Sequence, residues 1–404
     1  MKSRAFAFIA TGALLLALLA GSIVVEPASS GDTPLIDPEA FSGRIAQYPK
    51  GESEIQGGGA SNRATLIRDF DLNPDVPNVV ERWAPVIFQD TDQLVDLFTA
   101  VNFDGNWLGA DNATNWRHYP LPGVVYYSMV RSATHIFLGY YFYHAESYGS
   151  FTDHEHDFEG IVAALNRSTG QLEAILTNVH GPYVPYVAPW DVWRIQIKKQ
   201  HQGGYRDQLD FTLIRRYPRS PLNRHPRPSG LSYAYDTLAV GIEANTHAVW
   251  GRWHNKCVIG PAGSPSGCDD SHGGDGVVYV YTDKAEVPVV FNQFPNWIEY
   301  GYQLRDIKDL WDKAQDPAYC GQTENTAIFA CQSRSPWDVF NSAGDDAGDL
   351  PWVWGTDGVL DHVCDGPNIL LNPAEIFLDW FEFAPNTFSS VYVDQPYTMS
   401  TPCP

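Results

Sequence analysis

The sequence predicts a mainly β protein, an antiparallel β-sandwich with long loop insertions and a few short helices. Aromatic residues make up 13% of its 404 residues, and these side chains favour strands. Short apolar runs are separated by turn residues, among them 34 Gly and 29 Pro, a pattern typical of all-β domains. Two segments, 304–314 and 373–381, have the apolar spacing of short helices.

The N-terminal residues predict export. Lys2 and Arg4 precede an apolar run over 5–25, and small residues near 20–22 and 28–30 offer cleavage sites. We therefore expect a signal peptide within residues 1–30 and a secreted protein. The run is long enough that an uncleaved signal anchor is the alternative. No later apolar run could span a bilayer, so we expect no transmembrane span beyond this possible anchor.

The rest of the chain is expected to form one domain. Residues 31–75 have little periodicity and predict a poorly ordered segment, whereas 76–404 predict a single β-sandwich domain with cysteines in its C-terminal half. Order is expected to begin near 80–88. Strands over 123–129 and 135–144 predict a hairpin that turns at 131–133.

The next hairpin carries the densest cluster of ionisable residues. Asp153 to Glu159, with the sequence DHEHDFE, has six ionisable side chains in seven residues, which repel one another unless a cation or proton compensates. A strand over 157–165 would place Asp157 and Glu159 on one face, with His154 just upstream. A solvated acidic loop is the simpler alternative.

The hairpin register adds a second imidazole. Turn residues at 166–170 predict that 171–180 returns beside the first strand, with Asp157 opposite about Val179. His180 would then lie beside the acidic cluster. Mixed nitrogen and oxygen ligands suit a divalent cation, with Mg²⁺, Ca²⁺, Mn²⁺ and Zn²⁺ all compatible.

The segment DHEHDFEGIVAAL resembles the heptapeptide GHRHDWE and the following strand of the NLP toxins, the necrosis- and ethylene-inducing peptide-like proteins. The resemblance covers about a third of the chain. It implies divalent-cation ligands at His154, Asp157 and Glu159, with Glu146 as the upstream acid. His180-Gly181 resembles a His-Gly pair beside the family's metal pocket, and His247-Ala248 loosely matches a later His-Ala segment.

Three heptapeptide positions depart from the family pattern. Asp153 replaces the leading Gly, Glu155 replaces the Arg and Phe158 replaces the Trp. The two acidic replacements add negative charge, and Asp153 would line the pocket. The resemblance implies a necrosis-inducing-like toxin or cytolysin, whose partner is a membrane glycolipid or cell-surface carbohydrate.

The C-terminal half has further candidate features. A strand over 241–250 would carry His247, which faces either the core or the pocket. The Asp/Gly-rich run 268–276 predicts a turn, although Ca²⁺ binding is an alternative. The basic patch 215–228 is either an exposed loop or an anion contact. A strand over 277–281 and a short C-terminal strand over 389–392 complete the prediction.

The cysteine count and the net charge indicate disulfide bonds and exclude a nucleic-acid partner. Six cysteines in an exported chain favour disulfides. We expect the sequential pairing 257–268, 320–331 and 364–403, because it closes two short loops and tethers the C-terminus. A zinc site is the alternative, but no pair of cysteines has the CxxC spacing. The formal net charge is −22, which repels nucleic acid. We expect no nucleic-acid partner.

Three functions remain open at this level. The first is cation-dependent recognition of a glycolipid or sugar, in which no bond is broken. The second is a metal-dependent hydrolase that uses the same site, with His180 or His156 as the base. The third is an interaction protein in which a cation only braces a loop. A serine hydrolase is disfavoured because no Gly-x-Ser-x-Gly motif occurs.

Overall fold

The computed structural model describes residues 76–399, all within one compact unit that spans Gly57–Pro404. It leaves out residues 92, 108–110, 148–153, 179–182, 189–193, 200–212, 215–236, 252–275, 283, 290–297, 317, 320, 323–329, 332–349, 353 and 355–365. The expected signal segment, the N-terminal segment 31–75, the basic patch and the Asp/Gly-rich run therefore lie outside the described residues. The cysteines do too, except for the backbone of Cys331. In the described part of the chain, no helix has the length and apolar character needed to cross a membrane.

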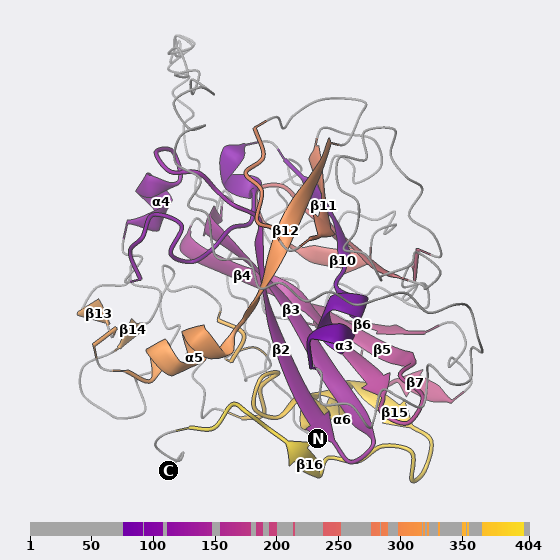
Figure 1. The fold of residues 1–404 in the computed structure, drawn as a ribbon. Coiled ribbons are helices and arrows are strands. Elements are labelled where there is room, and N and C mark those ends of the chain that lie inside the picture. The colour runs from indigo at the N-terminus through magenta and orange to yellow at the C-terminus, as the bar shows by residue number, and fades with distance from the viewer. Residues whose placement is uncertain are drawn as a thin grey trace, which may run out of the picture. The chain divides into compact units, whose positions relative to one another are not determined.

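A mixed sheet dominates the described residues (Figure 1). Its strands follow the order β10-β9-β1-β11-β12-β2-β3-β4-β5-β6, with β16 added to β2 and β8 added to β9. The bounds are β1 Val86–Asp90, β2 Val124–Ser132, β3 His135–Ser147, β4 His154–Asn166, β5 Leu172–Asn178, β6 Tyr183–Val187, β8 Leu213–Ile214, β9 Thr237–Ile242, β10 Val249–Gly251, β11 Gly276–Tyr281, β12 Ile298–Asp306 and β16 Tyr392–Asp394. Two small two-stranded sheets are not hydrogen-bonded to it, β7 Ile195–Ile197 with β15 Phe381–Phe383, and β13 Gly321–Gln322 with β14 Ala330–Cys331.

The prediction of a mainly β protein with few helices is confirmed, but the sheet is mixed and not an antiparallel sandwich. Strands β2 to β6 form an antiparallel meander, as expected for segments joined by short turns. Three other pairs are parallel, namely β1 with β9, β11 with β12 and β12 with β2. These partners are far apart in sequence or joined by long connections, which a parallel crossover requires. Local hairpin reasoning could not find them.

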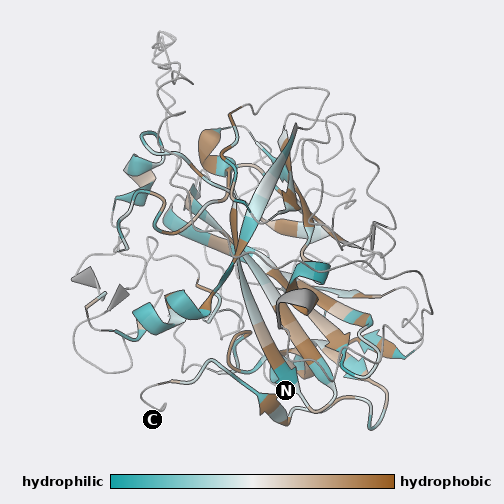
Figure 2. Cartoon of the chain, viewed as in Figure 1, coloured by the Kyte–Doolittle hydropathy of each residue, from teal (hydrophilic) through white to brown (hydrophobic). Residues whose placement is uncertain are grey.

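The central strands are buried on both faces. Along β3, alternate residues enter two different clusters: Leu138, Tyr140 and Phe142 belong to one, and Phe137 and Tyr141 to the other. The second cluster includes side chains from helices and C-terminal segments that cover this face, among them Trp311, Trp352, Trp354 and Phe377. In Figure 2 the hydrophobic colour marks the lower parts of these strands, whereas their upper parts are pale or hydrophilic. Burial on both faces explains the nearly continuous apolar sequence of β3.

The helices are short and partly match the prediction. They are α3 Val76–Trp83, the 3₁₀ turn η1 Leu94–Asp96, α4 Asn112–Asn115, α5 Lys308–Ala314 and α6 Pro373–Trp380. Helix α6 confirms the prediction for 373–381. The helix predicted over 304–314 starts only at Lys308, because Leu304 pairs with Val125 of β2 at the end of β12. Strand pairing overrides the local helical spacing there.

Both predicted hairpins form, with adjusted limits. Strands β2 and β3 turn at Ala133 and Thr134, and both extend beyond the predicted ranges. Strands β4 and β5 turn where the Asn166 N–H donates to the Gln171 carbonyl at 2.8 Å. Ile161 pairs with Thr177, whereas the predicted register would place it opposite Ile175. A register irregularity after Ala164 contributes to this offset.

A buried hydrogen-bonded pair ties the β2–β3 turn to the β4–β5 hairpin. His135 Nε2 lies 2.8 Å from Glu173 Oε2, and Asn166 Nδ2 donates to Glu173 Oε1 at 2.9 Å. Both acidic and basic partners are buried. Burial by itself raises the pKa of Glu173, but the hydrogen bonds from His135 and Asn166 outweigh it, and the pKa ends below its usual 4.5.

This pair gives a testable pH dependence. Because the folded-state pKa of Glu173 is depressed, the pair stabilises the fold above pH 4.5, and that stability is lost as the pH falls through the folded-state pKa. Glu173→Gln should lower the free energy of unfolding at pH 7 by about 1–2 kcal/mol and should flatten its decline in acid. Urea unfolding at stepped pH measures both. The exposed Glu382→Gln is the control, and an unaltered acid slope in Glu173→Gln would contradict the assignment.

Candidate metal centre

Strand pairing sets the first half of the site. In the β3–β4 ladder, His144 lies opposite Asp157 and Phe142 lies opposite Glu159. Directly opposed residues project to the same face of a sheet, so His144 and Asp157 stand side by side. Both are buried, as is Glu159. The heptapeptide strand therefore presents its carboxylates to the protein interior and not to solvent.

A turn supplies the third side chain. The strand predicted over 241–250 is wrong: β9 ends at Ile242, β10 begins at Val249, and residues between them form a turn. Asn245 and His247 both have positive φ, 67° and 56°, a conformation that Asn and His adopt more readily than most residues. The Asn245 N–H donates to Asp96 Oδ1 at 2.8 Å. This contact fixes the turn against η1 and directs His247 into the interior.

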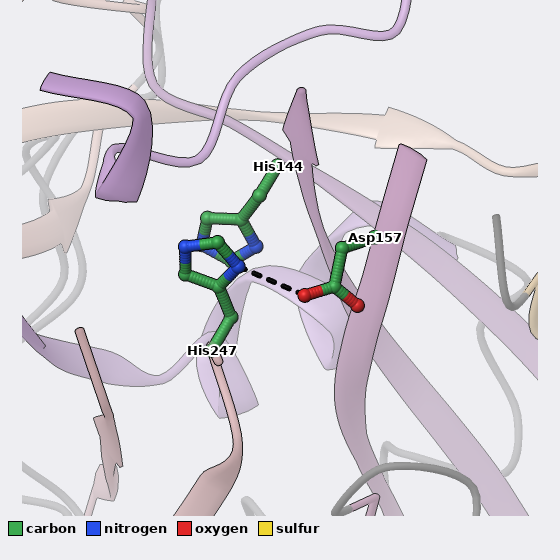
Figure 3. A group of neighbouring side chains, drawn as sticks. All are labelled: His144, Asp157 and His247. Atoms are coloured by element: carbon green, nitrogen blue, oxygen red, sulfur yellow. Dashed lines mark hydrogen bonds and ion pairs between the residues drawn. The ribbon is translucent and has the colours of Figure 1, made fainter. Parts of the chain in front are cut away.

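His144, Asp157 and His247 form one compact group (Figure 3). One donor atom from each lies within 4.8 Å of the other two. His247 Nδ1 lies 2.8 Å from Asp157 Oδ2, and its Nε2 lies 3.3 Å from Asp96 Oδ1. The two imidazole rings stack, with centroids 3.7 Å apart and an interplanar angle of 3°. None of the three residues is more than 2% exposed.

The charges of the two imidazoles differ. Burial would lower the pKa of His247, but hydrogen bonds to Asp157 and Asp96 and the charges of those carboxylates outweigh it and raise the pKa to about 9. Burial lowers the pKa of His144 well below 6.5, and the nearby His247 lowers it further. The stack therefore consists of one imidazolium and one neutral imidazole at neutral pH. Two buried like charges at this distance would repel strongly.

A divalent cation fits this donor set. Two imidazoles and a carboxylate are ligands that several divalent ions accept. The Nδ1 atom of His144 is buried and has no hydrogen-bond partner in the described part of the chain. Buried polar atoms are nearly always paired in proteins, so an unpaired one signals a missing ligand or ion.

Only some of the predicted site residues belong to the buried group. Asp157 and His247 belong to the group, and Glu159 is buried one strand repeat from Asp157. His154 lies in β4 opposite Ser147, but its side chain is outside the described part of the chain. Asp153 and His180 lie entirely outside the described residues.

Two further predicted residues make other contacts. Glu146 is half-buried, and its Oε2 accepts the Trp116 Nε1–H at 2.9 Å. His156 has φ 63°, and its Nδ1 lies 2.7 Å from the Tyr143 hydroxyl. Because that hydroxyl oxygen also accepts from Asn112 Nδ2 at 2.6 Å, its proton points to His156. His156 therefore has a hydrogen-bonding role against β3.

Glu155, near the start of β4, is another acidic residue with a shifted pKa. Its Oε1 accepts the backbone N–H of Ala113 at 2.8 Å, and Glu146 lies opposite it in the ladder. Burial raises the pKa of Glu155 to about 7, the Ala113 hydrogen bond opposes this shift, and the charges of Asp111 and Glu146 add to it. A cation close to this end of the strand would lower that pKa again.

Sequence reasoning missed His144, Asp96 and Gln89. The signal for His144 was present: it ends the strand predicted over 135–144, and antiparallel pairing with the heptapeptide strand would have placed it opposite the acidic run. Asp96 and Gln89 carry no motif, and they reach the site only through η1 and β1.

Comparison with known proteins finds matches only among solved structures, and these matches are distant. Neither models of protein families nor curated proteins match it. A structure described as a "toxin fold for microbial attack and plant defense" matches with 13% identity and a TM-score of 0.26, over 56% of this chain and 76% of that one. Necrosis and Ethylene inducing Protein 2, from the causal agent of cocoa's Witches Broom disease, matches with 11% identity and a TM-score of 0.27, over 60% of this chain and 80% of that one. Several of the matching structures are named as NLP or necrosis- and ethylene-inducing proteins.

A third NLP structure, NLPPya in complex with glucosamine, matches with 12% identity and a TM-score of 0.25, over 55% of this chain and 71% of that one. These are the proteins whose heptapeptide the DHEHDFE segment resembles. The likeness is distant in identity and in superposition. The function proposed below therefore rests on the residues of this chain.

Proposed function

We propose that this chain is a secreted, divalent-cation-binding protein that recognises a cell-surface glycolipid or carbohydrate, as a toxin or cytolysin does. Residues 1–30 would be the signal peptide, and the six cysteines would form disulfides after export. The cation would be Mg²⁺, Ca²⁺, Mn²⁺ or Zn²⁺. Recognition would not require any bond to be broken.

The buried group of His144, Asp157 and His247 is the observation that carries this proposal. Its Asp157 lies on the strand of the heptapeptide and also belongs to the ligand set that the NLP resemblance implies. That set would be completed by His154, Glu159 and Glu146, with His180 and Asp153 lining the adjoining pocket. The recognition half of the proposal is supported by the same heptapeptide resemblance.

A metal-dependent hydrolase remains the second candidate, because a cation with an open coordination position can activate water. The burial of the group favours recognition over hydrolysis. A substrate must reach the metal-bound water, and the three donors expose at most 2% of their surface. A buried cation can still order the surface elements that a ligand contacts.

Binding measurements test the proposed function. The mature chain should bind glycosphingolipid-containing vesicles or members of a glycan array, should lose binding in EDTA, and should regain it when a divalent cation is restored. His180→Ala should weaken binding about tenfold, equivalent to about 1.4 kcal/mol, while its unfolding free energy stays within about 1 kcal/mol of the parent.

Two outcomes would overturn the recognition proposal. Binding that is indifferent to EDTA would remove the cation from the function. Release of a cleaved headgroup or sugar during incubation would favour the hydrolase instead. Phosphatidylcholine vesicles without glycolipid are the matched control for nonspecific adsorption.

A further inference from the structure

We propose that His144 Nδ1, His247 Nδ1 and an Asp157 oxygen form the three-donor site of a borderline transition ion of the Zn²⁺ class, and that Gln89 and Asp96 are positioning residues for the two imidazoles. This inference deepens the proposed function by naming the kind of cation and the residues that select it. It differs from the oxygen-rich ligand set implied by the heptapeptide.

The orientation of Gln89 determines the tautomer of His144. Gln89 Nε2 donates to the carbonyl oxygens of Asp90 and Glu243, at 2.9 Å and 3.4 Å. The amide oxygen is therefore the atom that lies 3.3 Å from His144 Nε2. A carbonyl oxygen only accepts hydrogen bonds, so Nε2 of His144 carries the proton. Its Nδ1 is left as a buried lone pair.

That lone pair points into the group. A ring nitrogen of His144 lies on the same side as the His247 nitrogen that contacts Asp157 (Figure 3). This nitrogen is Nδ1, because Nε2 is directed to Gln89. It has no hydrogen-bond partner in the described part of the chain, and His144 is fully buried. A neutral imidazole nitrogen in this state is a ready ligand for a metal ion.

Asp96 plays the corresponding role for His247. Its Oδ1 accepts from Asn245 N at 2.8 Å and faces His247 Nε2 at 3.3 Å, while its Oδ2 accepts from Gln93 N at 2.6 Å. A carboxylate held on both oxygens cannot turn away, so it keeps Nε2 protonated and Nδ1 directed at Asp157. Carboxylate–histidine–metal arrangements of this kind orient ligands and raise their basicity.

In the metal-free protein, a proton lies between His247 Nδ1 and Asp157 Oδ2, where the ion would bind. His247 Nδ1 and Asp157 Oδ2 are 2.8 Å apart, a hydrogen-bond distance. Two ligand atoms on a tetrahedral zinc are separated by about 3.3 Å, as follows from bonds of about 2.05 Å. Binding would therefore separate this pair by about half an ångström and release the Nδ1 proton of His247 to solvent.

The donor types decide the class of ion. Imidazole nitrogen suits Zn²⁺ and its first-row neighbours, whereas Ca²⁺ and Mg²⁺ bind six or more oxygens. Two nitrogen donors and one carboxylate cannot satisfy Ca²⁺ without several further oxygens. The full burial of the group leaves little room for the waters that Mg²⁺ retains.

Titration of the EDTA-treated, dialysed mature chain with Zn²⁺ and Co²⁺ tests the site. With one water as the fourth ligand, Co²⁺ should give the intense visible absorption of a tetrahedral complex, and Zn²⁺ should abolish it at one equivalent, whereas excess Ca²⁺ or Mg²⁺ should not. His144→Gln should remove the absorption. Gln89→Met and Asp96→Asn should weaken Zn²⁺ binding by about 10- to 100-fold. Gln89→Glu, which keeps an acceptor, should recover part of the affinity, and the exposed Asp312→Asn should match the parent.

The outcomes separate this inference from the proposed function. Unchanged Zn²⁺ affinity in folded His144→Gln or Gln89→Met, judged by circular dichroism, would overturn the inference, as would Ca²⁺ binding in place of Zn²⁺. If Zn²⁺ binds through His144 but no glycolipid or sugar is recognised, only the proposed function fails. If recognition needs Ca²⁺ and survives His144→Gln, only the zinc-class site fails.

Discussion

Asp157→Ala should yield a protein without stoichiometric metal and about 3–5 kcal/mol less stable than the parent. Asp157 is the residue that both ligand sets share, so its removal takes a donor from either one. In the metal-free protein its carboxylate also pairs with His247 at 2.8 Å in a fully buried setting. Removing one partner of a buried pair costs about 3–5 kcal/mol, and because His247 keeps its 3.3 Å contact with Asp96, the loss should fall at the lower end of that range.

Elemental analysis of the purified protein and urea unfolding in EDTA measure the two effects separately. Asp394→Ala is the matched control, because Asp394 pairs with Arg131 at 2.7 Å while both side chains are partly exposed. Such a pair contributes at most about 1 kcal/mol, and its loss should leave the metal content unchanged. Full metal retention by Asp157→Ala would exclude this aspartate from the site. The double variant Asp157→Ala/Glu159→Ala extends the test, because Glu159 is the next carboxylate along the strand.

Gly160→Val should destabilise the fold by more than about 3 kcal/mol. A Cβ at this position would meet the Tyr140 carbonyl oxygen far inside van der Waals contact, and would lie 3.1 Å from both the Tyr141 Cα and the Trp354 ring. Two of these neighbours are backbone atoms of the paired strand and cannot turn away. Overpacking of a core usually costs about 1–3 kcal/mol, and a branched side chain against backbone should exceed that range.

Thermal and urea unfolding measure this loss of stability. The β3–β4 ladder also links Gly160 to the candidate site, because the same ladder pairs His144 with Asp157. If the strands separate at Gly160, then His144 and Asp157 lose their alignment, so metal affinity should fall together with stability. Gly105→Ala is the control. At Gly105 φ is +88° and a Cβ would meet no atom within 4 Å, so the cost should be about 1–2 kcal/mol from backbone strain alone. Equal losses in the two variants would show that packing at Gly160 is looser than the contacts imply.

Local patterns predicted much of the fold. The β2–β3 and β4–β5 hairpins and helix α6 follow from turn residues and periodicity, which act between neighbours in the sequence. Errors arose where distant segments pair. Leu304 belongs to a strand because β2 lies beside it, and the run 241–250 breaks because the Asn245 backbone N–H is bound by Asp96.

For the candidate site, the sequence by itself determined the heptapeptide strand, the place of Asp157 on it and the candidacy of His247. The DHEHDFE motif was sufficient for the first two, because a dense run of ligand side chains is a local property. His247 was a candidate through the loose match of His247-Ala248 to a His-Ala segment of the family. Only the tertiary structure decided that His144, Gln89 and Asp96 join them. Their positions depend on strand register, on a turn with positive φ and on β1 lying beside β9. Those contacts join residues up to 154 positions apart, a separation at which no periodicity or spacing carries information.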